Sequence, residues 1–271
     1  MNTILESIIV HKRAETAERK SLYPVKLLEQ SLCFETKPVS LEKYLLRDDL
    51  NGIIAEFKRK SPSKGMINAY ADVEKTTLSY MQAGASALSV LTDEKFFGGK
   101  NADLEAARRV NYCPVLRKDF VIDEYQIIEA KSLGADAILL IAAVLSVEEV
   151  KNLSALAFSL GMEVLLEIHN ENELDRIVSG IKLVGINNRD LNSFEVNVNR
   201  SFEMAAFLPS EITLVSESGI ADPETVNQLR EVGFRGFLMG ELFMKAPFPG
   251  KACANFISKL KLNTNALITA Q

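Results

Sequence analysis

The chain has 271 residues, of which 47% are hydrophobic and 25% charged; this balance is typical of a globular protein and excludes a disordered or fibrous one. A formal net charge of −5 excludes a general electrostatic attraction to nucleic acid or to an anionic membrane. Cys33, Cys113 and Cys253 are an odd, scattered set without CxxC spacing, which predicts reduced thiols rather than a disulfide framework.

The first fifty residues predict a helical extension. Ile4, Leu5 and Ile8 lie on one side of an amphipathic segment at residues 4–20. We expect residues 1–50 to form helices that cover one end of the domain that follows; the alternative is a flexible arm. Glu6 and the lack of an apolar core before a cleavage site argue against a secretory signal. Apolar runs are far shorter than the roughly 20 residues of a membrane span, so we expect a cytoplasmic protein.

From about residue 52 onward, short β-branched runs alternate with longer amphipathic segments. This alternation is typical of repeated strand–helix units that build a parallel sheet. Helices are predicted between the strands, for example at residues 73–82, 124–133, 147–160 and 223–232. We predict eight strands, at residues 53–57, 87–91, 115–117, 137–141, 163–167, 183–186, 213–216 and 236–239.

The predicted helices carry signals at both ends. Residues that can cap the first turn precede four of them: Asp72, Asp123, Ser146 and Asp222. Glycines that can end the last turn follow: Gly84, Gly134, Gly161 and Gly233. Eight units favour a closed barrel over an open doubly wound sheet, which would have a GxGxxG turn after its first strand. We therefore predict an α/β fold, a single (β/α)8 TIM barrel at residues 51–260 with the N-terminal helical extension and a C-terminal tail at 261–271.

Charged residues stand at the ends of three predicted strands. Glu56 and Lys58 are two residues apart and point the same way, Lys118 ends the third strand, and Glu167 ends the fifth. One such charge alone is usually solvated. Because function in parallel barrels collects at the carboxyl ends of the strands, and because unpaired buried charges cost several kcal/mol, the four together predict a paired network suited to catalysis.

The last two strands are followed by small polar residues and glycine. Ser218 and Gly219 follow one strand, and Gly240 and Glu241 follow the other. Backbone N–H groups at these two positions commonly bind phosphate in such barrels. The sequence predicts a phosphorylated substrate, although both glycines could simply form tight turns.

Seven segments, in order, resemble the indole-3-glycerol phosphate synthase family. The resemblance covers nearly the whole chain, including residues 4–6 and 11–13 of the extension. It implies a carbon–carbon carboxy-lyase of tryptophan biosynthesis, which converts 1-(2-carboxyphenylamino)-1-deoxyribulose 5-phosphate to indole-3-glycerol phosphate with loss of CO₂ and water. The segments are residues 56–63, 91–99, 116–120, 166–169, 185–191, 216–220 and 239–241.

The resemblance also implies roles for the catalytic residues. Lys118 is expected to be the general acid and Glu167 its partner base or acid in dehydration. Glu56 and Lys58 are expected to shape the charge network, and the division of acid roles between the two lysines stays open. Asn187 and Ser218 complete the catalytic set.

The implied substrate-binding residues fall into three groups. Asn187 and Arg189 are expected to bind a sugar hydroxyl and a carboxylate, with Glu217 and Ser218 at the rim of the site. Phosphate is expected on Ser61, Ser218, Gly219, Gly240 and the backbone of Glu241. Phe97, Phe120 and Leu139 match the pocket for the aromatic ring, although they could equally be barrel packing.

No organic cofactor or metal is expected: the family requires none, and His11 and His169 are far apart in the sequence. We expect a monomer that binds a small phosphorylated molecule and neither nucleic acid nor membrane; contact with other tryptophan-pathway enzymes stays open.

One rival function is that of another phosphate-binding barrel of the pathway, phosphoribosylanthranilate isomerase or tryptophan synthase α, but these enzymes lack the Glu56 and Lys58 pair together with Lys118 and Glu167. A second rival is a Schiff base on Lys118, which borohydride trapping would detect. A third is a catalytically dead scaffold, and the intact motifs argue against that one.

Overall fold

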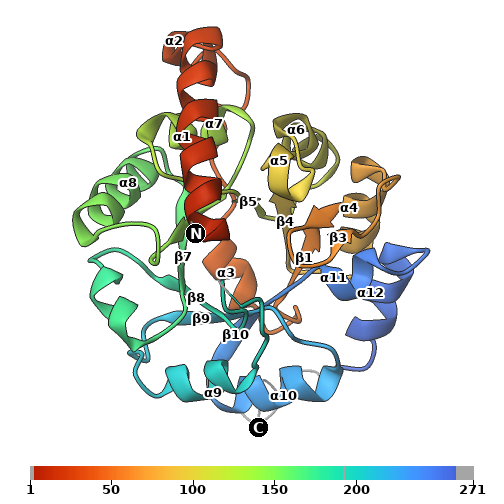
Figure 1. Ribbon diagram of the computed structural model, residues 1–271. Coiled ribbons are helices and arrows are strands. Elements are labelled where there is room, and N and C mark those ends of the chain that lie inside the picture. The colour runs from red at the N-terminus through yellow and green to blue at the C-terminus, as the bar shows by residue number, and fades with distance from the viewer. Residues whose placement is uncertain (1–2, 192, 261–271) are drawn as a thin grey trace, which may run out of the picture.

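The computed structural model describes residues 3–191 and 193–260, so the predicted tail at 261–271 lies outside the described residues. Eight parallel strands close into a barrel in which each strand pairs with its neighbours in the sequence and the last pairs with the first. This confirms the predicted (β/α)8 fold (Figure 1). The strands are β1 (Ile53–Phe57), β4 (Ala87–Leu91), β5 (Val115–Lys118), β6 (Ala137–Ile141), β7 (Glu163–Ile168), β8 (Leu183–Asn187), β9 (Thr213–Glu217) and β10 (Phe234–Met239).

Helices surround the barrel on its outside (Figure 1). The four predicted capping residues each accept a hydrogen bond from a backbone N–H of the first turn. The four predicted glycines all have positive φ. The helices are α4 (Val73–Gln82), α5 (Glu94–Phe97), α6 (Asn101–Val110), α7 (Glu124–Ser132), α8 (Val147–Ser159), η1 (Glu171–Arg176), α9 (Asn199–Ala205), α10 (Pro223–Glu231), α11 (Glu241–Met244) and α12 (Pro249–Ile257).

A short hairpin, β2 (Lys60–Ser61) and β3 (Gly65–Met66), lies in the loop after β1. No strands were predicted there from the sequence. Because each strand has only two residues, the pair is too short to show the alternation by which longer strands are predicted.

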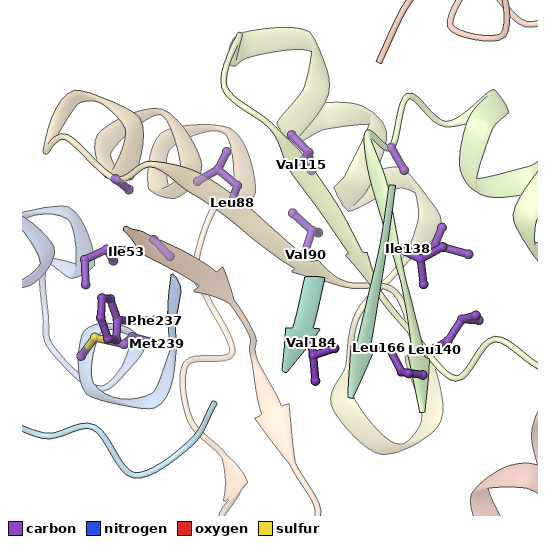
Figure 2. Close-up of a cluster of buried hydrophobic side chains, with 14 of the residues drawn as sticks. Ile53, Leu88, Val90, Val115, Ile138, Leu140, Leu166, Val184, Phe237 and Met239 are labelled. Carbon is purple, nitrogen blue, oxygen red and sulfur yellow. The ribbon is translucent and has the colours of Figure 1, made fainter. Parts of the chain in front are cut away.

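The barrel has two apolar layers because successive side chains of a strand point to opposite faces. The outer layer packs against the helices and includes Ile53, Phe57 and Leu166; part of it is drawn in Figure 2. The inner layer fills the barrel and includes Ile54, Leu116, Leu165 and Val215. The residues two positions after these four are Glu56, Lys118, Glu167 and Glu217. Strand alternation therefore turns all four charged side chains toward the barrel interior at its carboxyl end.

The N-terminal segment contributes α1 (Ile4–Leu22), α2 (Val25–Leu28) and α3 (Leu41–Leu45). α1 begins with a capping box between Thr3 and Glu6 and runs outward from the middle of the barrel past α7 (Figure 1). Leu41 and Leu45 of α3 pack into the inner layer, beside the amino-end residues of the strands. Among the described residues, no helix is both long and apolar enough to cross a membrane.

Candidate active site

One pocket opens at the carboxyl ends of the barrel strands, and every candidate residue predicted from the sequence lies in its wall. The predicted residues come from all eight barrel strands and the loops that follow them. The wall includes Glu56, Lys58, Ser61, Phe97, Lys118, Phe120, Leu139, Glu167, Asn187, Arg189, Glu217, Ser218, Gly219, Gly240 and Glu241.

The centre of the pocket is a cluster of ion pairs. Lys118 Nζ lies 2.8 Å from Glu167 Oε2 and 2.8 Å from Glu217 Oε2. Lys58 Nζ lies 2.5 Å from Glu56 Oε1. The three carboxylates are almost completely buried, whereas the lysine side chains are 17% and 12% exposed, so the two ammonium groups are the parts of the cluster that a ligand can reach.

Burial and charge pairing together set the protonation of this cluster. Burial alone would lower the pKa of Lys118, but the neighbouring carboxylates of Glu167, Glu217 and Glu56 outweigh it and raise the pKa. Lys118 is therefore a charged ammonium at neutral pH.

The two carboxyl groups that share Lys118 behave differently. Burial would raise the pKa of Glu167, but Lys118 and His169 hold that pKa well below its usual range. Burial and the negative charge of Glu167 raise the pKa of Glu217, against the pull of Lys118. One carboxylate thus stays ionised while the other can carry a proton. No three His, Cys, Asp or Glu side chains within residues 3–191 and 193–260 are arranged to hold a metal ion.

Glu217 lies deeper than the sequence analysis expected. We expected it at the rim, but its side chain is buried and pairs directly with Lys118. Rim positions follow the end of a strand, whereas Glu217 is the last residue of β9 and points inward like Val215. Space for its carboxylate comes from the neighbouring strand, where Gly185 has no side chain.

Asn187 and Arg189 extend the cluster toward the pocket mouth. Asn187 Nδ2 donates to Glu167 Oε1 at 3.1 Å, and Asn187 Oδ1 accepts from the backbone N–H of Arg189 at 3.0 Å. The Arg189 guanidinium donates to the carbonyl of Phe194 and lies 3.5 Å from Glu241 Oε2. Asn187 therefore orients Glu167, and Arg189 is a partly exposed cation at the rim.

The loops after β9 and β10 and the loop after β1 meet on one side of the pocket. Ser218 and Gly219 both have left-handed φ values, +68° and +81°. Glu241 begins α11, and the first N–H groups of a helix have no partner within the helix. The hydroxyl of Ser61 is buried nearby in the same wall. This arrangement of hydroxyl and amide donors suits an anion.

The opposite wall is apolar. The rings of Phe97 and Phe120 have their centroids 5.9 Å apart at an interplanar angle of 41°, beside Leu139. A further part of this pocket was not predicted from the sequence: Ile4, Leu5 and Ile8 of α1 also line it. Their amphipathic spacing was a visible signal, but nothing in the spacing identified which surface they would contact.

A second ion-pair network joins α1 to the strand end beside Lys118. Lys12 is 3% exposed, and its Nζ lies 3.0 Å from a carboxylate oxygen of Asp93 and 3.0 Å from one of Asp119. Arg117 pairs with the other side of Asp119, at 3.2 Å. The helix that lines the pocket is thereby fixed to the loops after β4 and β5.

Comparisons with known proteins assign the family. A model of the indole-3-glycerol phosphate synthase family matches residues 5–256. The chain is 50% identical to indole-3-glycerol phosphate synthase of Bacteroides thetaiotaomicron over 261 residues. This alignment covers 96% of this chain and 100% of that protein. The chain is 41% identical over 257 residues to the enzyme of that name from Carboxydothermus hydrogenoformans, with 92% and 97% covered.

Solved structures agree on the fold alone. A chain of the tryptophan synthase complex of Pyrococcus furiosus is similar with a TM-score of 0.55 at 15% identity, covering 78% of this chain and 98% of that one. A 3-hexulose-6-phosphate synthase is similar with a TM-score of 0.58 at 11% identity, and the match covers 78% of this chain and 100% of that one. The family model matches residues 5–256, and the identity to the two indole-3-glycerol phosphate synthases extends over more than 90% of the chain. The chain therefore belongs to the indole-3-glycerol phosphate synthase family.

Proposed function

We propose that the cluster around Lys118 carries out the reaction of this family, closure of the pyrrole ring of indole on a phosphorylated sugar. The chain is a carboxy-lyase of tryptophan biosynthesis. The observation that carries the residue roles is the position of Lys118 Nζ, which lies 2.8 Å from each of two buried carboxylates and faces the pocket.

Lys118 acts as the general acid of ring closure. Its ammonium donates a proton to the ketone oxygen of the substrate while the ring carbon that bears the carboxylate attacks the ketone carbon. CO₂ then leaves, and the electrons of the broken C–C bond restore the aromatic ring. Because its carboxylate neighbours raise the pKa of Lys118, the amine is charged and is not the free nucleophile that a Schiff base needs.

Dehydration follows at the same carbon. The new hydroxyl takes a second proton from one of the two lysine ammonium groups, Lys58 or a reprotonated Lys118, and leaves as water; Glu167 removes a proton from the adjacent CH₂ group to form the double bond of the pyrrole ring. Two protons are delivered and one is removed, so each turnover takes up one proton. Glu167 suits the role of base because Lys118 and His169 keep it ionised.

The remaining residues bind the substrate. Its phosphate rests on Ser61, Ser218, Gly219, Gly240 and the backbone of Glu241, and its aromatic ring lies against Phe97, Phe120 and Leu139. Asn187 and Arg189 contact a sugar hydroxyl and the carboxylate. Lys58, held by Glu56, adds a second cation beside the reacting groups. The monomeric state and the cytoplasmic location stay predictions.

The reaction can be followed directly because the chain contains no tryptophan. We expect tryptophan-like fluorescence to appear when 1-(2-carboxyphenylamino)-1-deoxyribulose 5-phosphate is added, with one CO₂ released for each indole formed. Folded protein that produces neither signal would contradict the proposed function. Trapping of protein and substrate by borohydride would instead favour a Schiff base on Lys118.

A further inference from the structure

His169 is a buried imidazole that the mechanism above does not use. It follows β7 by one residue, and its side chain is 8% exposed. Nε2 lies 3.3 Å from Glu167 Oε1, and Nδ1 lies 3.4 Å from Glu173 Oε2. Neither ring nitrogen makes a well-formed hydrogen bond within the described residues, but each lies within ion-pair distance of a carboxylate.

Glu173 is held in place to face the ring. Its Oε2 accepts a hydrogen bond from the backbone N–H of His169 at 2.8 Å, and its Oε1 accepts one from Asn170 Nδ2 at 3.1 Å. Its side chain is 12% exposed, whereas that of Glu167 is 3% exposed. The imidazole therefore lies between a carboxylate at the active site and a carboxylate nearer the solvent.

These two carboxylates decide the charge of the ring. Burial alone would lower the pKa of His169, but Glu167 on β7 and Glu173 on η1, the charged groups that face it, raise that pKa to about 9. The imidazole is thus an imidazolium at neutral pH. Glu167 has two cationic neighbours, Lys118 at Oε2 and His169 at Oε1.

The second cation matters when Lys118 has given its proton to the substrate. At that moment Lys118 is neutral, and without His169 the buried carboxylate of Glu167 would have only neutral donors, the Lys118 amine and the amide of Asn187, as partners. We propose that His169, held between Glu167 and Glu173, is a positioning residue that keeps the carboxylate of Glu167 ionised and oriented until it removes the CH₂ proton. The inference rests on the proposed role of Glu167 as the base.

The charge state can be read in the wild-type protein without substrate. The chain contains only two histidines, so ¹⁵N-histidine labelling gives signals from two imidazole rings. The signals that remain in the His11→Asn variant are those of His169. We expect the His169 ring to be doubly protonated at pH 7.5 and to titrate at a pH well above the ordinary range of a histidine. A neutral His169 ring between pH 7 and pH 8 would overturn the inference whatever the enzyme activity is.

The effect on Glu167 is read from the chemical step. In single-turnover mixing with excess enzyme, His169→Asn should slow indole formation roughly 10- to 100-fold, the size expected when a charged partner of a buried group is lost. The acid limb of its pH profile should move to higher pH, because loss of a neighbouring cation raises the pKa of Glu167. His11→Asn, the same change at the other histidine, should behave like wild type.

Glu173→Gln separates charge from structure. Glutamine keeps an acceptor for the N–H of His169 but removes one of the two charges that raise the pKa of the ring. Its rate should approach the wild-type rate at low pH and fall toward the His169→Asn rate as the pH rises through the lowered pKa of His169. A wild-type rate for His169→Asn at every pH, or a pH-independent defect in Glu173→Gln, would overturn the inference. If wild type forms no indole, it is the proposed function that fails.

Discussion

A β-carbon on Gly185 would lie 2.2 Å from Oε1 of Glu217, which is closer than any real non-bonded contact. The two residues occupy neighbouring strands, and β8 pairs with β9 along this stretch. The missing side chain at Gly185 is what allows the Glu217 carboxylate to fold inward and pair with Lys118.

Gly185→Ala should therefore impair catalysis although it replaces no charged residue. The added methyl group pushes the Glu217 carboxylate away from Lys118, and we expect a fall in kcat of about tenfold or more, together with a loss of about 1–3 kcal/mol in the free energy of unfolding from overpacking. Steady-state kinetics and urea unfolding measure the two effects. Glu217→Gln should reproduce the kinetic loss, and the double variant should add little; a fully additive double variant would count against the coupling.

Lys118→Ala should keep the barrel but lose turnover by about 10²- to 10⁴-fold, the usual contribution of a positioned acid. Lys60→Ala is the matched control, because Lys60 donates to the carbonyl of Lys95 and is not part of the pocket wall. The fluorescence assay measures both variants, with circular dichroism as the check on folding. Near-normal turnover in Lys118→Ala would refute the role.

Gly219→Ala should weaken phosphate binding while leaving kcat nearly unchanged. Gly219 has φ +81°, and its β-carbon would lie 2.5 Å from Cγ1 of Val196, so an alanine must move the loop. We expect KM, and the inhibition constant of inorganic phosphate, to rise on the order of tenfold.

Gly233→Ala provides the control for the backbone effect. Gly233 has φ +102°, nothing lies within 4 Å of its β-carbon position, and it is far from the pocket wall. Both variants should lose about 1–2 kcal/mol of stability from the left-handed conformation, but only Gly219→Ala should show the higher KM. An equal change of KM in both would remove the support for a phosphate site.

Lys12→Met should lower the free energy of unfolding by about 3–5 kcal/mol, because it leaves buried Asp93 and Asp119 without their shared cation. Lys20→Met, in the same helix, breaks an exposed pair with Asp123 and should cost less than about 1 kcal/mol. Urea unfolding of the three proteins compares them. Equal losses at the two lysines would show that the buried network contributes no more than a surface pair.

The effect of Lys12→Met should depend on pH. Lys12 and Arg117 lower the pKa of Asp119 against its burial, so the stabilisation from this carboxylate is present above its ordinary pKa and is lost as the pH falls. The pKa of Lys12 is raised, so the stabilisation from its charge is fully present at every pH below the ordinary pKa of a lysine. The difference in the free energy of unfolding between wild type and Lys12→Met should be largest between about pH 5 and pH 9 and should shrink below about pH 4.

Local patterns were sufficient to predict the framework of this protein. Asp72 and Asp123 cap the helices that they precede, since an N-cap needs only a side-chain oxygen and the next few N–H groups of the same chain. Strand alternation likewise placed Glu56, Lys118 and Glu167 inside the barrel, because the direction of a side chain in a strand depends only on whether its position is odd or even.

The sequence by itself thus determined the barrel, its strand order and the set of side chains at its carboxyl end. Tertiary structure alone decided how deeply Glu217 lies, that Gly185 makes room for it, that α1 forms a wall of the pocket, and that Lys12 is buried among carboxylates. These are contacts between residues far apart in the chain. Their distances depend on how whole elements pack, and no local pattern of residues encodes a distance between two strands or between a helix and a loop.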